Sequence, residues 1–158
     1  MFSWRITKYD PLKRDDEGSY LDPEEWTCFS DVGTKVTFAE FVKTEQKYLE
    51  AISFFMDEIE LNHAYVKALE HWSDEDKNPH PFLSEIRIGK VLNVQEIQQL
   101  ARLTLRNEAW CKIAFENQFF VHFGYDYYMY IGAYKNCTKA IDSVTKLGLF
   151  VEEFVSPY

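Results

Sequence analysis

The sequence predicts an α+β fold: an antiparallel sheet made of N-terminal strands, a C-terminal three-strand meander and a last strand, packed with about three helices. Three stretches have the apolar spacing of amphipathic helices, and the chain switches to a two-residue period after residue 109. Strands and helices grouped in runs are typical of this fold class. With 158 residues, no internal repeat and no evident domain boundary, the chain is expected to be one domain, residues 1–158.

The first strands are predicted before residue 31. Residues 3–9 (SWRITKY) are rich in β-branched and aromatic side chains, which favours a strand. Residues 10–25 contain two prolines, one glycine and seven acidic residues, so a surface loop with room for a short helical turn is expected. Residues 26–30 (WTCFS) are predicted as a second strand, followed by a turn at Gly33.

A long helix is predicted over residues 38–60. Thr37 and Glu40 have the T-x-x-E spacing of a capping box, in which each side chain accepts a hydrogen bond from the other residue's backbone amide. Val36 and Phe41 occupy the two positions of a hydrophobic staple. Apolar residues then recur at helical spacing, so one face of this helix is expected to pack inward.

The segment after this helix has two interpretations. Residues 64–72 (AYVKALEHW) fit either a strand or more helix, because Val66 and Leu69 do not decide between the two periods. Residues 73–81 are expected to form a solvated loop. Residues 85–92 (EIRIGKVL) alternate weakly and are predicted as a short edge strand.

Two further helices are predicted from their end signals. Asn93 and Glu96 have the spacing of a capping box at the start of the second helix. Asn136 is expected to cap the third helix, and Gly148 is placed where a glycine ends a helix. A last strand is predicted over residues 149–155.

Between the second and third helices, three stretches alternate as antiparallel strands do. They are residues 110–116, 119–125 and 127–133, with turns at Asn117 and residues 124–126. Eight of the fourteen residues in FFVHFGYDYYMYIG are aromatic if histidine is counted. Alternation places one set of these side chains under the helices, and either a second layer covers the other set or it forms an open recognition surface. That other set is Phe120, His122, Tyr128 and Tyr130.

The charge of the chain restricts its partners. The formal net charge is −9, which disfavours binding to nucleic acid backbones and to anionic membrane surfaces. Residues 1–80 hold 18 acidic and 9 basic residues, whereas residues 81–158 hold 8 of each. The acidic residues cluster so that one side of the protein is expected to be strongly negative and to attract a cationic partner. The alternative is that the carboxylates are simply solvated around loops.

No compartment signal or catalytic motif is evident. The first ten residues do not resemble a signal peptide and no apolar run approaches about 20 residues, so a reduced, cytoplasmic chain is expected. The four histidines fit no metal-binding spacing, and no phosphate-binding glycine motif or G-x-S-x-G occurs. Cys111, His122 and Asp126 are weighed as a catalytic set, but nothing near Cys111 indicates an activated thiolate. We therefore expect no enzyme, no cofactor and no metal.

Several stretches carry a resemblance to a known group of proteins: ITKYDP…EWTCFSDVG, LRNEAWCKI, FVHFGYDYYMYIG and GLFVEEFVSPY. They resemble the bacterial immunity proteins of polymorphic toxin systems, including those of contact-dependent growth inhibition. The resemblance implies a cytoplasmic, noncatalytic protein that binds a cognate toxin domain. Many such toxins are nucleases with a basic cleft, which an acidic protein would occlude. No binding residue carries over from so diverse a group.

The binding site is therefore predicted from charge and exposed rings alone. Trp26, Tyr20, Trp72 and Tyr125 are candidate aromatic anchors. The alternative function is a small-molecule-binding domain or minor enzyme with an aromatic pocket around His122, Tyr125 and Tyr127. The predicted toxin-binding residues are Asp57, Glu58, Glu60, Glu70, Trp72, Asp74, Glu75, Asp76, Tyr125 and Asp126.

Overall fold

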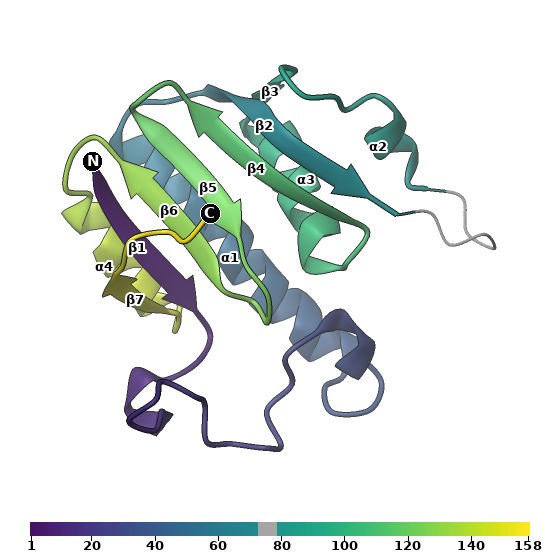
Figure 1. The fold of residues 1–158 in the computed structure, drawn as a ribbon, viewed down its shortest axis with the longest axis vertical. Coiled ribbons are helices and arrows are strands. Elements are labelled where there is room, and N and C mark those ends of the chain that lie inside the picture. Colours follow the sequence, from purple (N-terminus) through teal and green to yellow (C-terminus); the bar gives the residue numbers. More distant parts are fainter. Residues whose placement is uncertain (73–78) are drawn as a thin grey trace.

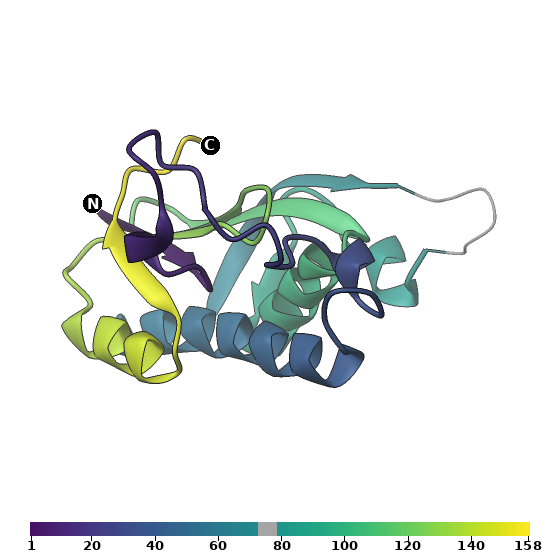
Figure 2. The same cartoon turned by 90° about the horizontal axis from the view of Figure 1, so that it is seen from below.

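The computed structural model describes residues 1–72 and 79–158. Over these residues the chain forms one seven-stranded antiparallel sheet with three main helices against one face, which confirms the α+β prediction (Figures 1 and 2). In the same residues, no helix is long and apolar enough to cross a membrane.

The strand order in the sheet is β3-β2-β4-β5-β6-β1-β7, so the N-terminal strand lies inside the sheet and the last strand lies at one edge. The strands are β1 (Phe2–Thr7), β2 (His63–His71), β3 (Val91–Asn93), β4 (Ala109–Phe115), β5 (Phe119–Phe123), β6 (Met129–Ala133) and β7 (Phe150–Glu153). The helices are α1 (Phe38–Glu58), α2 (Pro81–Ser84), α3 (Val94–Leu105) and α4 (Thr138–Lys146), with short 3-10 turns at Pro11–Lys13 and Phe29–Asp31.

The core lies between the sheet and helices α1, α3 and α4. Alternate residues of the meander, such as Ile113, Val121 and Ile131, are fully buried on this side of the sheet. Helix α1 packs against both α3 and α4, and Gln98 Nε2 of α3 donates to Ser53 Oγ of α1 at 2.8 Å. The predicted inward face of α1 is therefore confirmed.

The opposite face of the sheet is covered by irregular chain rather than by a described helix. The N-terminal loop and the C-terminal tail both lie on this side (Figure 2). The tail passes over the centre of the sheet, where Phe154 and Tyr158 each lie 5.8 Å from the ring of Tyr130. The Nδ1 atom of His122 lies 2.8 Å from Ser156 Oγ, which holds the tail in place. The aromatic ribbon is thus core on one face and partly covered on the other.

Two of the predicted helix starts are confirmed in atomic detail. Thr37 Oγ1 accepts from the backbone amide of Glu40 at 3.2 Å, and Asn93 Oδ1 accepts from that of Glu96 at 3.0 Å. Helix α1 ends at Glu58, two residues before the predicted end, because Glu60 adopts a left-handed conformation with φ of 57°.

The ambiguous segment after α1 is strand β2. Ala64 and Val66 face the core, and a bulge between Val66 and Ala68 shifts the next core-side position to Leu69, which pairs with the buried Cys111, while His71 at the end of the strand is exposed. The extra residue interrupts the two-residue period, which explains why the sequence pattern favoured neither structure.

The predicted strand at residues 26–30 is wrong. This segment leads into the 3-10 turn at Phe29–Asp31, where the Asp31 carboxylate accepts from the backbone amide of Thr27 at 2.8 Å. Trp26 and Phe29 pack edge-on against Phe41 of α1. The aromatic residues that raised the strand propensity serve instead to close the core over the start of α1.

The predicted strand at residues 85–92 is also wrong for most of its length. Residues 81–84 form helix α2, and Glu85 ends it. Gly89 makes a turn with φ of 87°, so that only β3 pairs with β2 at the sheet edge.

The third helix is not capped by Asn136 as predicted. Its N-cap residue is Cys137, whose side chain makes no capping bond. The Glu58 carboxylate, at the end of α1, accepts from the backbone amide of Ala140 at 2.7 Å. A neighbouring helix therefore supplies the acceptor that the local sequence lacks.

Candidate functional site

The structure separates the predicted toxin-binding residues into two groups. Four of them lie around two adjoining hollows at one corner of the sheet: Glu70, Trp72, Tyr125 and Asp126. Three lie where α1 ends and β2 begins: Asp57, Glu58 and Glu60. Asp74, Glu75 and Asp76 lie outside the described residues.

The two groups are far apart because strand β2 runs from one to the other. At about 3.3 Å per residue, its nine residues extend over about 30 Å. The acidic loop at residues 22–25 lies near the start of α1, because the Nζ atom of Lys35 donates to the carbonyl of Pro23 at 3.3 Å. Glu60 lies at the other end of α1. The acidic clusters at residues 22–25 and 57–60 therefore lie at opposite ends of α1. The prediction of one negative side stays a prediction, because residues 74–76 lie outside the described residues.

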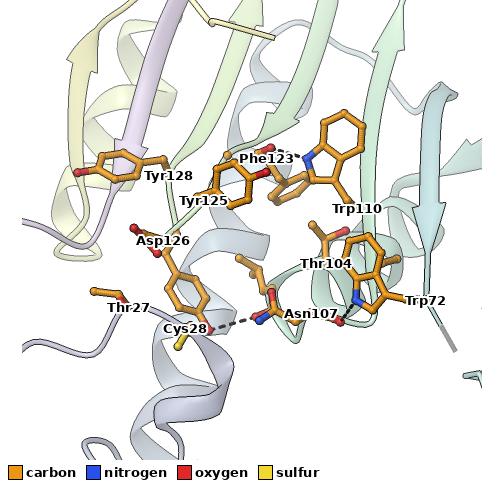
Figure 3. A pocket seen from close by; sticks show the side chains of 14 residues that line it. Thr27, Cys28, Trp72, Thr104, Asn107, Trp110, Phe123, Tyr125, Asp126 and Tyr128 are labelled. Atoms are coloured by element: carbon orange, nitrogen blue, oxygen red, sulfur yellow. Dashed lines mark hydrogen bonds between the residues drawn. The ribbon is translucent and has the colours of Figure 1, made fainter. Parts of the chain in front are cut away.

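We call the first group and its neighbours the aromatic corner (Figure 3). It is formed by the ends of β2, β4 and β5, by the β5–β6 turn and by the C-terminal tail. Its two most exposed rings are Trp72, with 54% of its surface accessible, and Tyr125, with 85%. The aromatic corner consists of Glu70, Trp72, Trp110, Tyr125, Asp126 and Tyr158.

Both tryptophans of the corner have their polar atom bound within the chain. Trp72 Nε1 donates to the carbonyl of Asn107 and Trp110 Nε1 to that of Phe123, each at 2.8 Å (Figure 3). Asn107 follows the end of α3 with φ of 58°, a conformation that asparagine adopts more readily than most residues. The two indole rings are therefore fixed in position, and none of their hydrogen-bonding capacity is left for a partner.

Tyr125 and Asp126 are presented by a tight turn with unusual backbone geometry. Asp126 and Tyr127 both have positive φ, 55° and 62°, and the amide of Tyr128 donates to the carbonyl of Tyr125 at 3.1 Å. Two left-handed central residues define the type I′ turn of hairpins. A tyrosine in this conformation is strained by about 1–3 kcal/mol and needs strong support from its surroundings.

That support comes from the buried ring of Tyr127. It packs against Trp26, Phe41 and Tyr48, with ring centroids 5.1–6.3 Å apart. Its hydroxyl donates to the carbonyl of Leu105 at 3.1 Å, and its own carbonyl accepts from the Tyr48 hydroxyl at 2.8 Å. The turn is thus anchored in the core on one side and displays Tyr125 on the other.

Two adjoining hollows lie between these rings. The more enclosed one has a volume of about 180 Å³ and lies between Trp110, Tyr125, Asp126 and Thr27. A shallower groove of about 360 Å³ continues past Trp110 toward Glu70 and Tyr158.

Of the three residues predicted to form an aromatic pocket, Tyr125 and Tyr127 both line the enclosed hollow. The hydroxyl of Tyr127 is bound inside the core, and Tyr125 is 85% exposed. His122 is not among the described residues that line either hollow at the corner. Burial, with a smaller contribution from Lys112, lowers the pKa of His122 to about 4, so this ring is neutral at physiological pH.

The catalytic set that included Cys111 does not assemble either. Lys112 pairs directly with His122 across the sheet, so Cys111, its neighbour, points to the opposite face. Cys111 is fully buried near Thr104, and burial raises the pKa of its thiol to about 12. Among the described residues, no group of His, Cys, Asp or Glu is arranged to hold a metal ion.

The acidic group at the end of α1 is largely engaged within the chain. Glu58 binds the first turn of α4, as described above. Lys135 and Lys139 line the same shallow hollow as Asp57, Glu58 and Glu60, and so balance part of their charge. Asp57 and Glu60 remain exposed.

Sequence reasoning missed two members of the corner, Trp110 and Tyr158. The alternation in WCKIAF places Trp110 on the face opposite Cys111 and Ile113, and this signal was sufficient to find it. Two other predicted anchors are used internally. Tyr20 packs on Tyr9, and the ring of Trp26 is covered by Lys8 Nζ at 4.0 Å.

Comparisons of the chain with models of protein families, with curated proteins and with solved structures found no match.

Proposed function

We propose that this chain is a cytoplasmic, noncatalytic immunity protein that binds and neutralises a cognate bacterial toxin domain. The toxin is a nuclease with a basic active-site cleft, of the kind found in polymorphic toxin and contact-dependent growth inhibition systems. The aromatic corner is its binding surface, and neutralisation is steric and electrostatic. Neither nucleic acid nor membrane is a partner.

The observation that carries this proposal is the state of the rings at the aromatic corner. Trp72 and Tyr125 are both exposed, the Trp72 ring is held by its hydrogen bond to the carbonyl of Asn107, and the backbone that carries Tyr125 is fixed by the turn. Binding such rings costs little conformational entropy, and tryptophan and tyrosine are enriched among the residues that dominate protein interfaces. Preorganised, exposed rings of this kind favour recognition of a protein surface.

The charge of the chain supports a cationic partner. The net charge is −9, and Glu70 and Asp126 are both exposed at the rim of the corner. Opposite fields accelerate encounter, so association with a basic nuclease can approach about 10⁸–10⁹ M⁻¹s⁻¹ at low salt. Small-molecule sites are usually enclosed, with volumes of about 300–1,000 Å³, whereas here the enclosed hollow has only about 180 Å³ and the adjoining groove of about 360 Å³ is shallower.

The test is direct binding to the C-terminal domain encoded by the adjacent gene, measured with purified proteins at low and high salt. We expect nanomolar affinity that weakens as salt rises. In the double variant Trp72→Ala/Tyr125→Ala, affinity should fall about 100-fold or more, as for the loss of two interface anchors. Tyr134→Ala is the matched control, because Tyr134 is 50% exposed and follows β6 at the far end from the β5–β6 turn.

Two outcomes contradict the proposal. The absence of binding at either salt concentration removes the immunity function. If the affinity is unchanged in both the double variant and the Tyr134→Ala control, the interface lies away from the aromatic corner.

A further inference from the structure

The enclosed hollow of the aromatic corner has the size of one side chain. Its volume of about 180 Å³ equals that of about six water molecules at ~30 Å³ each. It opens between Trp110, Tyr125 and Asp126, at the surface assigned above to the partner (Figure 3). A protruding side chain of a bound protein therefore fits this space.

Several of the hydrogen-bond donors around the hollow are already used within the chain. The indole groups of Trp72 and Trp110 and the hydroxyl of Tyr127 already donate to backbone carbonyls. The hydroxyl of Thr104 donates to the carbonyl of Leu100 at 3.0 Å. The other polar groups that line the hollow are the carboxylate of Asp126, which only accepts, the hydroxyls of Thr27 and Tyr125, and the side-chain amide of Asn107. All of these groups can accept hydrogen bonds, as can the π faces of the rings, so a group rich in donors is complementary to the hollow.

The charge around the hollow also favours a cationic occupant. Asp126 lines the enclosed hollow and Glu70 lines the groove that continues from it. In residues 1–72 and 79–158, no lysine or arginine lies within ion-pair distance of either carboxylate. A cation entering between the rings gains an opposite charge and the attraction of the ring faces.

The protein already packs cations on its aromatic rings elsewhere. Lys8 Nζ lies 4.0 Å from the centroid of the Trp26 ring. Lys112 Nζ lies 5.5 Å from the centroid of Trp110 and 5.9 Å from that of Tyr158. Lys112 is not among the described residues that line the hollow, so it does not occupy the site.

We infer that the hollow receives one arginine side chain of the partner, an inference that rests on the proposed function. The guanidinium stacks against Trp110 or Tyr125 and donates to the carboxylate of Asp126. Arginine fits better than lysine because its planar group has five donors and no acceptor and stacks on aromatic rings, whereas an ammonium is compact and strongly hydrated. This contact would select among cationic partners.

The inference can be tested without the toxin. The probe is N-acetylarginine methylamide, titrated into the ¹⁵N-labelled protein while the indole N–H signals of its four tryptophans are followed by NMR. We expect saturable shifts of Trp72 and Trp110 in the millimolar range, as the contact of one side chain allows, with the buried Trp4 as internal reference. The citrulline analogue, which is neutral but of the same shape, should give no saturable shift.

Variants then locate the site. Asp126→Asn should raise the half-saturation concentration at least about threefold through loss of the charge-assisted hydrogen bond. Asp57→Asn, an exposed carboxylate at the other end of β2, is the matched control and should leave it unchanged. Equal shifts with the citrulline analogue, equal affinity for the lysine analogue, or no effect of Asp126→Asn would each overturn the arginine assignment.

This experiment separates the two proposals. If the toxin domain binds and the arginine probe does not, the hollow has another role and the immunity function stands. If the probe binds and the toxin domain does not, the arginine site stands and the proposed function falls.

Discussion

The aromatic corner and the acidic end of α1 lie at opposite ends of strand β2, and they use exposed polar and charged groups differently. At the corner, the indole N–H groups of both tryptophans are bound within the chain, and the Glu70 and Asp126 carboxylates are exposed. At the end of α1, Glu58 caps a neighbouring helix, and Lys135 and Lys139 line the same hollow as Asp57 and Glu60. Both regions are candidate surfaces by sequence, but the corner combines exposed carboxylates with exposed rings, whereas the end of α1 has lysines beside its exposed carboxylates.

The difference shows that the number of charges in a segment does not measure its availability for binding. Three acidic residues in DEIE lie at a helix C-terminus, where the helix dipole disfavours negative charge. Glu58 offsets this by placing its carboxylate at the positive N-terminus of α4. The cluster is thus explained by helix packing before any partner is considered.

The largest expected effect distinguishes the buried residue that supports the β5–β6 turn from the exposed residue that the turn presents. Tyr127→Ala should lower the free energy of unfolding by about 3–5 kcal/mol, because it removes a buried ring that joins the hairpin turn to the core. Tyr125→Ala, two residues away and 85% exposed, should change it by less than about 0.5 kcal/mol. Urea unfolding at constant pH measures both values. Similar losses in the two variants would mean that Tyr125 is part of the core packing and not a presented anchor.

A charge reversal compares the two regions directly. Glu70→Lys/Asp126→Lys should slow association with the toxin domain about tenfold at low salt, since rim charges act mainly on the association rate. Asp57→Lys/Glu60→Lys makes the same change in net charge at the other end of β2 and should slow association less than about twofold. Stopped-flow or surface-binding kinetics at two salt concentrations provide the rates. Equal slowing by both pairs would assign the effect to net charge and remove the special role of the corner.

A smaller effect concerns stability at the end of α1. Glu58→Ala should cost about 1 kcal/mol, the usual value of a lost helix cap, because the amide of Ala140 loses its acceptor. Asp57→Ala, whose side chain is exposed, should cost nothing measurable. Urea unfolding compares the two variants. If Glu58→Ala weakens toxin binding while stability is retained, this region belongs to the interface after all.

Local signals in the sequence were enough for much of the fold. The capping boxes at Thr37 and Asn93 involve residues three apart, and the meander repeats a two-residue period over three strands. These patterns do not depend on distant parts of the chain, so the helices and the central strands could be predicted. The same holds for the strand face that carries Trp110.

Features that depend on distant contacts could not be predicted. The cap of α4 comes from Glu58, 82 residues before Ala140. The bulge in β2 hides its period, and the left-handed Tyr127 is permitted only by rings from α1 and the N-terminal loop. The predicted site therefore contained two members of the corner turn, Tyr125 and Asp126, for their exposure and charge, but not the buried residue that places them.

The smallest effect tests whether the corner depends on the C-terminal tail. Burial lowers the pKa of His122 to about 4, below the ordinary value near 6.5, so the unfolded chain takes up a proton before the folded chain does. The folded state is therefore unaffected above about pH 6.5 and is progressively destabilised as the pH falls from 6.5 toward 4. Since His122 holds Ser156 and Tyr158 lies against Trp110, acid should loosen the tail at the corner first.

Hydrogen exchange of the tail amides between pH 7 and pH 4.5, corrected for intrinsic rates, measures this loosening. In His122→Gln the additional opening at low pH should disappear, because glutamine does not titrate, while any constant loss of the contact to Ser156 affects all pH values equally. A tail that opens to the same extent in both proteins as the pH falls would show that other groups control it. The corner would then keep Tyr158 in place independently of His122, and its rings would form a surface that is insensitive to acid.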